Sequence, residues 1–273
     1  VLPSYYAQDS IATIYQDWGE LERAFDYAKR NVAIKENLGL TEALPSAYVQ
    51  LAGIFVDRNE WGLAEEYYER AIRLIRENNG ERFFLVLNLI FWAQCFSLQG
   101  RWIEARVKAE EALAEAQMQS GLVLAVCRAV GAAIFVQTGS VQEGKDMLST
   151  AIIDLERMGF KKGLCHAYAF QAWFHHSEGA PAVVKEYARK TLALAAKLNC
   201  QQFFLTHYEM LQPILEVGLE SGTEVTFVQR ILVRAGERAL ALLEGLSGHA
   251  DPEVRMRTIA PLAEIGGPRV GET

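Results

Sequence analysis

The sequence contains five short turns that recur at an almost constant spacing. One residue of each turn serves as an anchor for comparing them: Gly19, Asn59, Gly100, Gly139 and Gly179. Successive anchors lie 40, 41, 39 and 40 residues apart. A period of this length is typical of proteins that stack copies of one supersecondary unit, because a single copy cannot bury its apolar faces alone. The chain is therefore predicted to fold as a repeat array.

Three positions around each anchor have a constant character. Seven residues before the anchor, every repeat has alanine: Ala12, Ala52, Ala93, Ala132 and Ala172. Five residues after it, the side chains are small: Ala24, Ala64, Ala105, Gly144 and Val184. Four residues before it, four of the five side chains are those of Tyr or Phe: Tyr15, Phe55, Phe96, Phe135 and His175. Small residues are needed where two antiparallel helices cross closely, and residues three apart share one helix face. The predicted fold class is therefore all-α, an α-α superhelix of helical hairpins.

This pattern resembles the tetratricopeptide repeat (TPR). The second repeat matches that family at Tyr48, Leu51, Ala52, Phe55, Trp61, Ala64, Tyr68 and Ala71, and the third matches at Leu89, Trp92, Ala93, Phe96, Trp102, Ala105 and Ala112. The resemblance covers about residues 5–200, but the period exceeds the usual ~34 residues. Long-period repeats are similar to the sensor superhelix of MalT-like regulators, the large ATP-binding LuxR-type bacterial transcription activators. They also resemble those of peptide-sensing regulators and kinesin light chains.

The repeat pattern suggests an organisation in three parts. Residues 1–235 are predicted to form the TPR-like solenoid, with a degenerate sixth pair at 203–235 whose first helix Pro213 interrupts. Residues 236–266 resemble a HEAT repeat, with Asp251 as helix N-cap and Pro252 in the first helical position. Residues 267–273 are expected to be a linker or tail. We also expect the chain to be a piece of a larger protein.

The composition excludes several functional classes. The chain has 27 basic and 34 acidic residues, a formal net charge of −7, which disfavours direct nucleic-acid binding. The longest apolar run, 83–96, is too short to cross a bilayer, and no secretory signal is present. The four cysteines form no CxxC pair, which argues against a disulfide or zinc framework and favours buried thiols in a reducing compartment. We therefore predict a cytoplasmic protein that does not bind membranes.

The sequence also lacks the motifs of common enzymes. It contains no phosphate-binding glycine loop, no HExxH and no GxSxG. His175 and His176 are adjacent on a predicted helix and point about 100° apart, so they cannot readily chelate one metal. We therefore predict no catalytic residues, no metal and no cofactor. An enzyme or metalloprotein in disguise is the least favoured alternative.

The concave groove remains the place for function. The TPR resemblance implies groove residues at 10, 6, 3 and 2 positions before each anchor. The site residues assigned in this way are Asp9, Thr13, Gln16, Asp17, Val49, Val56, Asp57, Ile90, Gln94, Ser97, Gln137, Trp173, His176 and Ser177. They include no Lys, Arg or Asn, which disfavours a clamp for the C-terminal carboxylate of chaperones. A specialised groove and an ordinary solenoid surface both fit this pattern.

Two functional hypotheses follow from these observations. The first is a non-catalytic module of a larger bacterial transcriptional or signalling regulator, which binds a protein, a peptide or a small effector in the groove and contacts neighbouring domains. The second is a free-standing scaffold that assembles proteins through its convex or edge surfaces. The sequence does not identify the partner or the oligomeric state.

Overall fold

The computed structural model of the chain describes residues 2–78, 80–119 and 121–266. Within these ranges every regular element is an α-helix or a short 3-10 helix, which confirms the predicted all-α class. The elements are α1 Leu2–Asp17, α2 Leu21–Asn37, η1 Thr41–Ala43, α3 Leu44–Asp57, α4 Trp61–Glu77, α5 Arg82–Leu98, α6 Trp102–Gln117, α7 Leu122–Gln137, α8 Val141–Met158, α9 Lys161–Ser177, α10 Pro181–Leu198, α11 Gln201–Thr206, α12 Tyr208–Ser221, α13 Val225–Ala235, η2 Gly236–Ala239, α14 Leu240–Ser247 and α15 Pro252–Gly266. The predicted tail at 267–273 lies outside the described residues.

The five anchors form the turns that the period predicted. Each adopts a left-handed backbone, with φ of 76° at Gly19, 60° at Asn59, 73° at Gly100, 94° at Gly139 and 71° at Gly179. In the first turn the Gly19 N–H donates to the Gln16 carbonyl at 2.8 Å, and the Glu20 N–H donates to the Tyr15 carbonyl at 2.8 Å. This is the Schellman ending, which satisfies the last carbonyls of a helix. The anchor residues therefore fix where each first helix stops.

Small residues lie where the helices of a hairpin touch. The alanines that lie seven positions before the anchors are at most 1% exposed. The alanines that lie five positions after the anchors, Ala24, Ala64 and Ala105, are fully buried. The fourth repeat has glycine at the second position, and a Cβ on Gly144 would lie 2.7 Å from the Ala132 carbonyl oxygen. Ala132 and Gly144 occupy the two predicted crossing positions of one hairpin. The predicted close approach of antiparallel helices is confirmed there.

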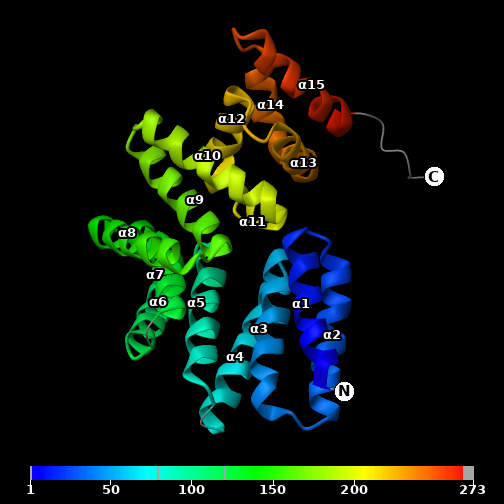
Figure 1. Cartoon of the computed structure of the whole chain (residues 1–273), viewed down its shortest axis with the longest axis vertical. Coiled ribbons are helices and arrows are strands. Elements are labelled where there is room, and N and C mark those ends of the chain that lie inside the picture. The colour runs from blue at the N-terminus through cyan, green and yellow to red at the C-terminus, as the bar shows by residue number, and fades with distance from the viewer. Residues whose placement is uncertain (1, 79, 120, 267–273) are drawn as a thin grey trace, which may run out of the picture. The chain divides into compact units, whose positions relative to one another are not determined.

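The chain divides into two compact units, and each is described by itself. The first unit extends to Ala167 and contains the hairpins α1/α2, α3/α4, α5/α6 and α7/α8, followed by the beginning of α9 (Figure 1). Its apolar core continues from hairpin to hairpin, so that buried side chains of α4, α5, α6 and α7 form one cluster. This continuity is expected of a solenoid, in which each repeat is stabilised by its neighbours.

The second unit begins at Tyr168 and runs through the rest of the described chain. The helix expected to be interrupted at Pro213 is instead broken at His207, between α11 and α12, and Pro213 lies inside α12. Asp251 caps α15, because its carboxylate accepts the Glu253 N–H at 2.9 Å, and Pro252 is the first residue of that helix. The HEAT-like character of this hairpin and the boundary at residue 235 remain predictions.

The stability of the second unit should depend on the ionisation of His207. This side chain lies between the rings of Phe170 and Phe203, with centroids 6.1 and 5.1 Å away, and burial lowers its pKa to about 4. In the unfolded chain the pKa of His207 is near 6.5. Between pH 6.5 and pH 4 the unfolded chain therefore binds a proton at His207 that the folded chain does not bind. The contribution of His207 to stability is therefore fully present above pH 6.5, and the free energy of unfolding is lower by about 2–3 kcal/mol at pH 4.5. Urea unfolding at pH 7.5 and pH 4.5 should show this loss in the wild type and in His176→Gln, an exposed control, but not in His207→Phe. An equal loss in His207→Phe would contradict the assignment.

Candidate functional site

Several predicted groove residues of the first unit connect neighbouring repeats. The Gln16 amide donates to the Asp57 carboxylate at 2.7 Å, and the Ser97 hydroxyl donates to the Gln137 side-chain oxygen at 3.2 Å. Both bonds join the position three residues before one anchor to the position two residues before the next. These four side chains therefore hold first helices together, and their polar atoms are already engaged.

Other predicted groove residues are covered. Ile90 is completely buried in the core and Val56 is 8% exposed, so neither offers surface to a partner in this conformation. Val49 and Gln94 are partly buried. In the first unit, these side chains from the middle of the predicted groove thus pack against neighbouring residues and do not form an open surface.

Six predicted groove residues remain. Asp9 and Thr13 lie on α1, where the Thr13 hydroxyl donates to the Asp9 main-chain carbonyl at 3.0 Å. Trp173, His176 and Ser177 lie in the second unit, where Trp173 packs on Phe174 with ring centroids 5.0 Å apart and His176 is exposed. Asp17 belongs to the first unit and forms an ion pair with Lys162 of α9, with Nζ 2.6 and 2.8 Å from the two carboxylate oxygens. This pair joins α1, the first helix of the first hairpin, directly to α9, the first helix of the fifth hairpin.

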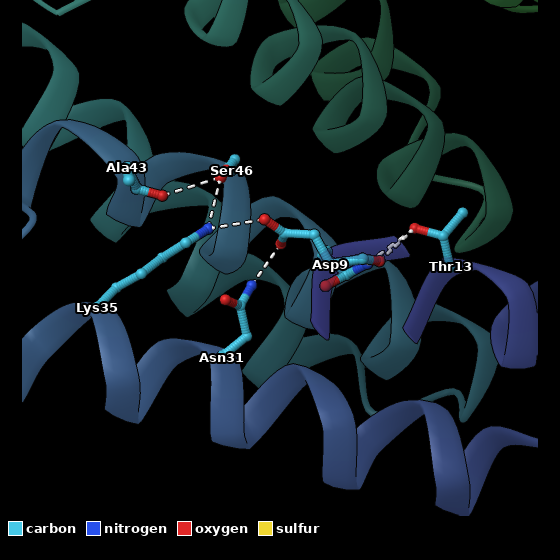
Figure 2. A network of polar contacts seen from close by, with 7 residues as sticks. Asp9, Thr13, Asn31, Lys35, Ala43 and Ser46 are labelled. Atoms are coloured by element: carbon cyan, nitrogen blue, oxygen red, sulfur yellow. Dashed lines mark hydrogen bonds and ion pairs between the residues drawn. The ribbon is translucent and has the colours of Figure 1, made fainter. Parts of the chain in front are cut away.

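A buried polar network lies in the first hairpin. The Lys35 side chain is 1% exposed, and its ammonium group donates to the Asp9 carboxylate at 3.0 Å and to the Ser46 hydroxyl at 3.0 Å. The Asn31 amide donates to the other oxygen of Asp9, and Ser46 donates to the Ala43 carbonyl at 2.8 Å (Figure 2). Helices α1 and α2, the 3-10 helix η1 and helix α3 all contribute to this network.

The network occupies positions that are apolar in the other repeats, with the exception of Thr191. Twelve residues after the anchor, the five repeats have Asn31, Ala71, Ala112, Ala151 and Thr191. Sixteen residues after it they have Lys35, Ile75, Ala116, Leu155 and Ala195. Ten residues before it they have Asp9, Val49, Ile90, Ala129 and Ala169. Only the first repeat places an acid, an amide and an amine together at these positions.

A cavity of about 490 Å³ opens onto this network. Its lining combines Asp9, Lys35 and Ser46 with the segment 39–43 and with Glu81 and Phe84 at the start of α5. Its volume falls within the ~300–1,000 Å³ typical of ligand sites, and six of its ten lining residues are polar or charged. We call it the Lys35 cavity. Asp9 is the one predicted site residue in its lining.

Sequence reasoning missed Asn31 and Lys35 because the implied groove positions lie only on the first helix of each pair, and it missed Ser46 because that residue lies outside the positions assigned on α3. A signal was present in the alignment of the repeats on their anchors. A lysine at a second-helix position where the other repeats have only apolar residues, four residues after Asn31, marks the first hairpin as different. The position of Ser46, by contrast, needed the structure.

The cysteines of this chain lie in its interior. All four cysteines are buried, and burial raises the pKa of Cys95 to about 11 and that of Cys127 to about 12. These two thiols are protonated near neutral pH and are poor nucleophiles. Across the described ranges, no group of three or more His, Cys, Asp or Glu residues could hold a metal ion. No helix in these ranges is long and apolar enough to cross a membrane.

The fold defines the class of protein, a superhelical helical-repeat array, and the comparisons agree with it. No family model and no curated protein matches the sequence. Among solved structures, the chain is similar to BtubC (BKLC) from P. vanneervenii, with 17% identity over 88% of this chain and 94% of that one and a TM-score of 0.52. It is also similar to a Rap protein in complex with competence and sporulation factor, with 16% identity over 96% of this chain and 76% of that one and a TM-score of 0.60. At these identities the similarity establishes the superhelical fold.

Proposed function

We propose that this chain is a non-catalytic interaction module that binds a segment of a partner protein, or a peptide, at the Lys35 cavity. One observation carries the proposal: the first repeat alone combines an acid, an amide and an amine, Asp9, Asn31 and Lys35, at these three positions, and Asp9 and Lys35 line an accessible cavity. A buried ion pair is often less stabilising than well-packed apolar side chains of similar volume. Binding of a ligand gives a reason to keep the polar set here.

The wider context belongs to the same proposal. The Rap protein to which the fold is similar was solved with competence and sporulation factor bound, which supports a ligand-binding role for an array of this kind. We infer that the module acts within a larger bacterial regulator of the MalT-like kind, in the cytoplasm. Ligand binding there would change its contacts with neighbouring domains.

A second candidate function, the scaffold, has its own supporting observation. The outer face of α6 presents Ile103, Val107 and Met118, which are 80%, 56% and 73% exposed. The matching residues of the preceding repeat are Gly62, Glu66 and Glu77. An exposed apolar stripe on a convex helix is typical of protein contact surfaces.

Capture from bacterial lysate on the immobilised chain can separate these functions. The variant Thr41→Trp adds bulk at the lining of the cavity, and Glu69→Trp adds the same bulk on an exposed part of α4. We expect a partner retained by the wild type to be reduced about tenfold by Thr41→Trp, which corresponds to ~1.4 kcal/mol, and to be kept by Glu69→Trp. Equal capture by both variants would remove the cavity from the proposal. Loss with Ile103→Glu/Val107→Glu instead would support the scaffold.

A further inference from the structure

The Lys35 cavity has an excess of hydrogen-bond acceptors over donors. Three carboxylates, those of Asp9, Glu42 and Glu81, line it together with one ammonium group, that of Lys35, so its formal charge is −2. Ionised carboxylates accept hydrogen bonds and donate none. Within the described residues neither Glu42 nor Glu81 has an ion-pair partner, and the neighbouring cation Arg82 pairs with Glu115, Nε to Oε2, at 3.3 Å. The cavity therefore offers negative charge that this chain leaves unneutralised.

Buried amides beside the cavity show the same imbalance. Asn31 and Gln50 both direct their NH₂ groups to Asp9, one to its carboxylate and the other to its main-chain carbonyl. Their side-chain oxygens are buried and have no donor among the described residues, although Asn31 is completely buried. Buried polar atoms in folded proteins are nearly always hydrogen-bonded. Neither amide is in the lining of the cavity, so these two oxygens show a shortage of donors around Asp9, while the excess of negative charge in the cavity rests on Glu42 and Glu81.

Leu40 and Phe84 supply the large apolar side chains of the lining. Leu40 and Phe84 are partly buried on the cavity wall, close in sequence to Glu42 and Glu81 respectively. Lysine and arginine combine a long aliphatic stem with a cationic head that carries several donors. A cationic head also binds favourably over an aromatic face. An anionic group would instead compete with Asp9 for Lys35, in a cavity that is already negative.

We propose that the Lys35 cavity binds an arginine or lysine side chain of the partner. Its stem packs on Leu40 and Phe84, and its head lies between the carboxylates of Glu42 and Glu81. This inference rests on the proposed function, because it names the chemistry of the segment that the cavity recognises.

Peptide mixtures test the inference without knowledge of the natural partner. Acetylated and amidated heptapeptides carry arginine, lysine, citrulline or glutamate at the centre and random uncharged residues around it. They are passed over the immobilised wild type, Glu42→Gln/Glu81→Gln, and the matched control Glu69→Gln/Glu77→Gln, which removes two exposed carboxylates of α4. We expect the arginine and lysine mixtures to be retained about tenfold more than citrulline, to fall to the citrulline level in the first variant, and to be unchanged in the control.

Each other outcome overturns the inference in a distinguishable way. Citrulline retained as well as arginine, or glutamate retained better, would show that the cavity does not select cations. If Thr41→Trp then abolishes retention, the proposed binding function survives. No retained mixture, together with binding of free spermidine, would assign the cavity to a small cation and not to a partner side chain. No retention at all, with lysate capture insensitive to Thr41→Trp, would overturn both proposals.

Discussion

Replacing Asp9 with alanine is expected to destabilise the first repeat by about 3 kcal/mol, because it leaves the ammonium group of Lys35 buried without its carboxylate. Lys35 is 1% exposed, whereas Asp9 is 27% exposed, so most of the loss comes from the lysine. Urea unfolding and hydrogen exchange of the α2 amides would measure it. The exchange rate should rise more for the amides of α2 than for those of α7.

The double variant Asp9→Leu/Lys35→Met is the control for this prediction. It gives the first repeat the apolar character that Ile90 and Leu155 have at the matching positions of the other repeats. We expect it to recover about 1–2 kcal/mol of this loss and not all of it, because the buried Asn31 amide also loses the Asp9 carboxylate to which it donates. If the single variant loses less than about 1 kcal/mol and the double variant gains nothing over it, Lys35 does not depend on Asp9, and the network is not a buried ion pair in solution.

The substitution Gly144→Leu should cost about 3 kcal/mol or more, through a different mechanism. A Cβ at this position would lie 2.7 Å from both the Ala132 carbonyl oxygen and the Val136 Cγ2 atom, so α7 and α8 would have to separate. Thermal and urea unfolding would detect the loss.

Gly62→Leu is the matched control, because it makes the same replacement in α4 where nothing lies within 4 Å of the new Cβ. There we expect a gain of about 0.5 kcal/mol from the better helix propensity of leucine. If the two variants change stability alike, helix propensity and not the close contact determines the role of Gly144.

The turns and hairpins were predictable because they depend on local and periodic features. A left-handed residue ends each first helix, and glycine or asparagine at Gly19, Asn59 and the later anchors supplies it. Small residues at the crossing positions follow from the distance between two helices within one hairpin. Both requirements repeat in every copy, so five copies reveal them together.

The candidate site was only partly predictable because it departs from the repeat. Asp9 was found from the TPR resemblance, but Lys35 lies on a second helix, where a charged residue is usually solvent-exposed. Its burial depends on how α1, α2 and α3 close around it. Ile90 and Val56 were assigned to an open groove and are buried, because the winding of the first unit depends on packing between repeats.

The ion pair between Asp17 and Lys162 bears on how this array can change in length. Repeat arrays usually tolerate the gain or loss of a copy, because each copy interacts only with its neighbours. Here residues 145 positions apart meet at 2.6 Å, so a copy inserted or deleted between them would misplace one partner. Duplicating or deleting a hairpin between α1 and α9 would therefore cost the first unit this ion pair, which links its first helix to the start of α9.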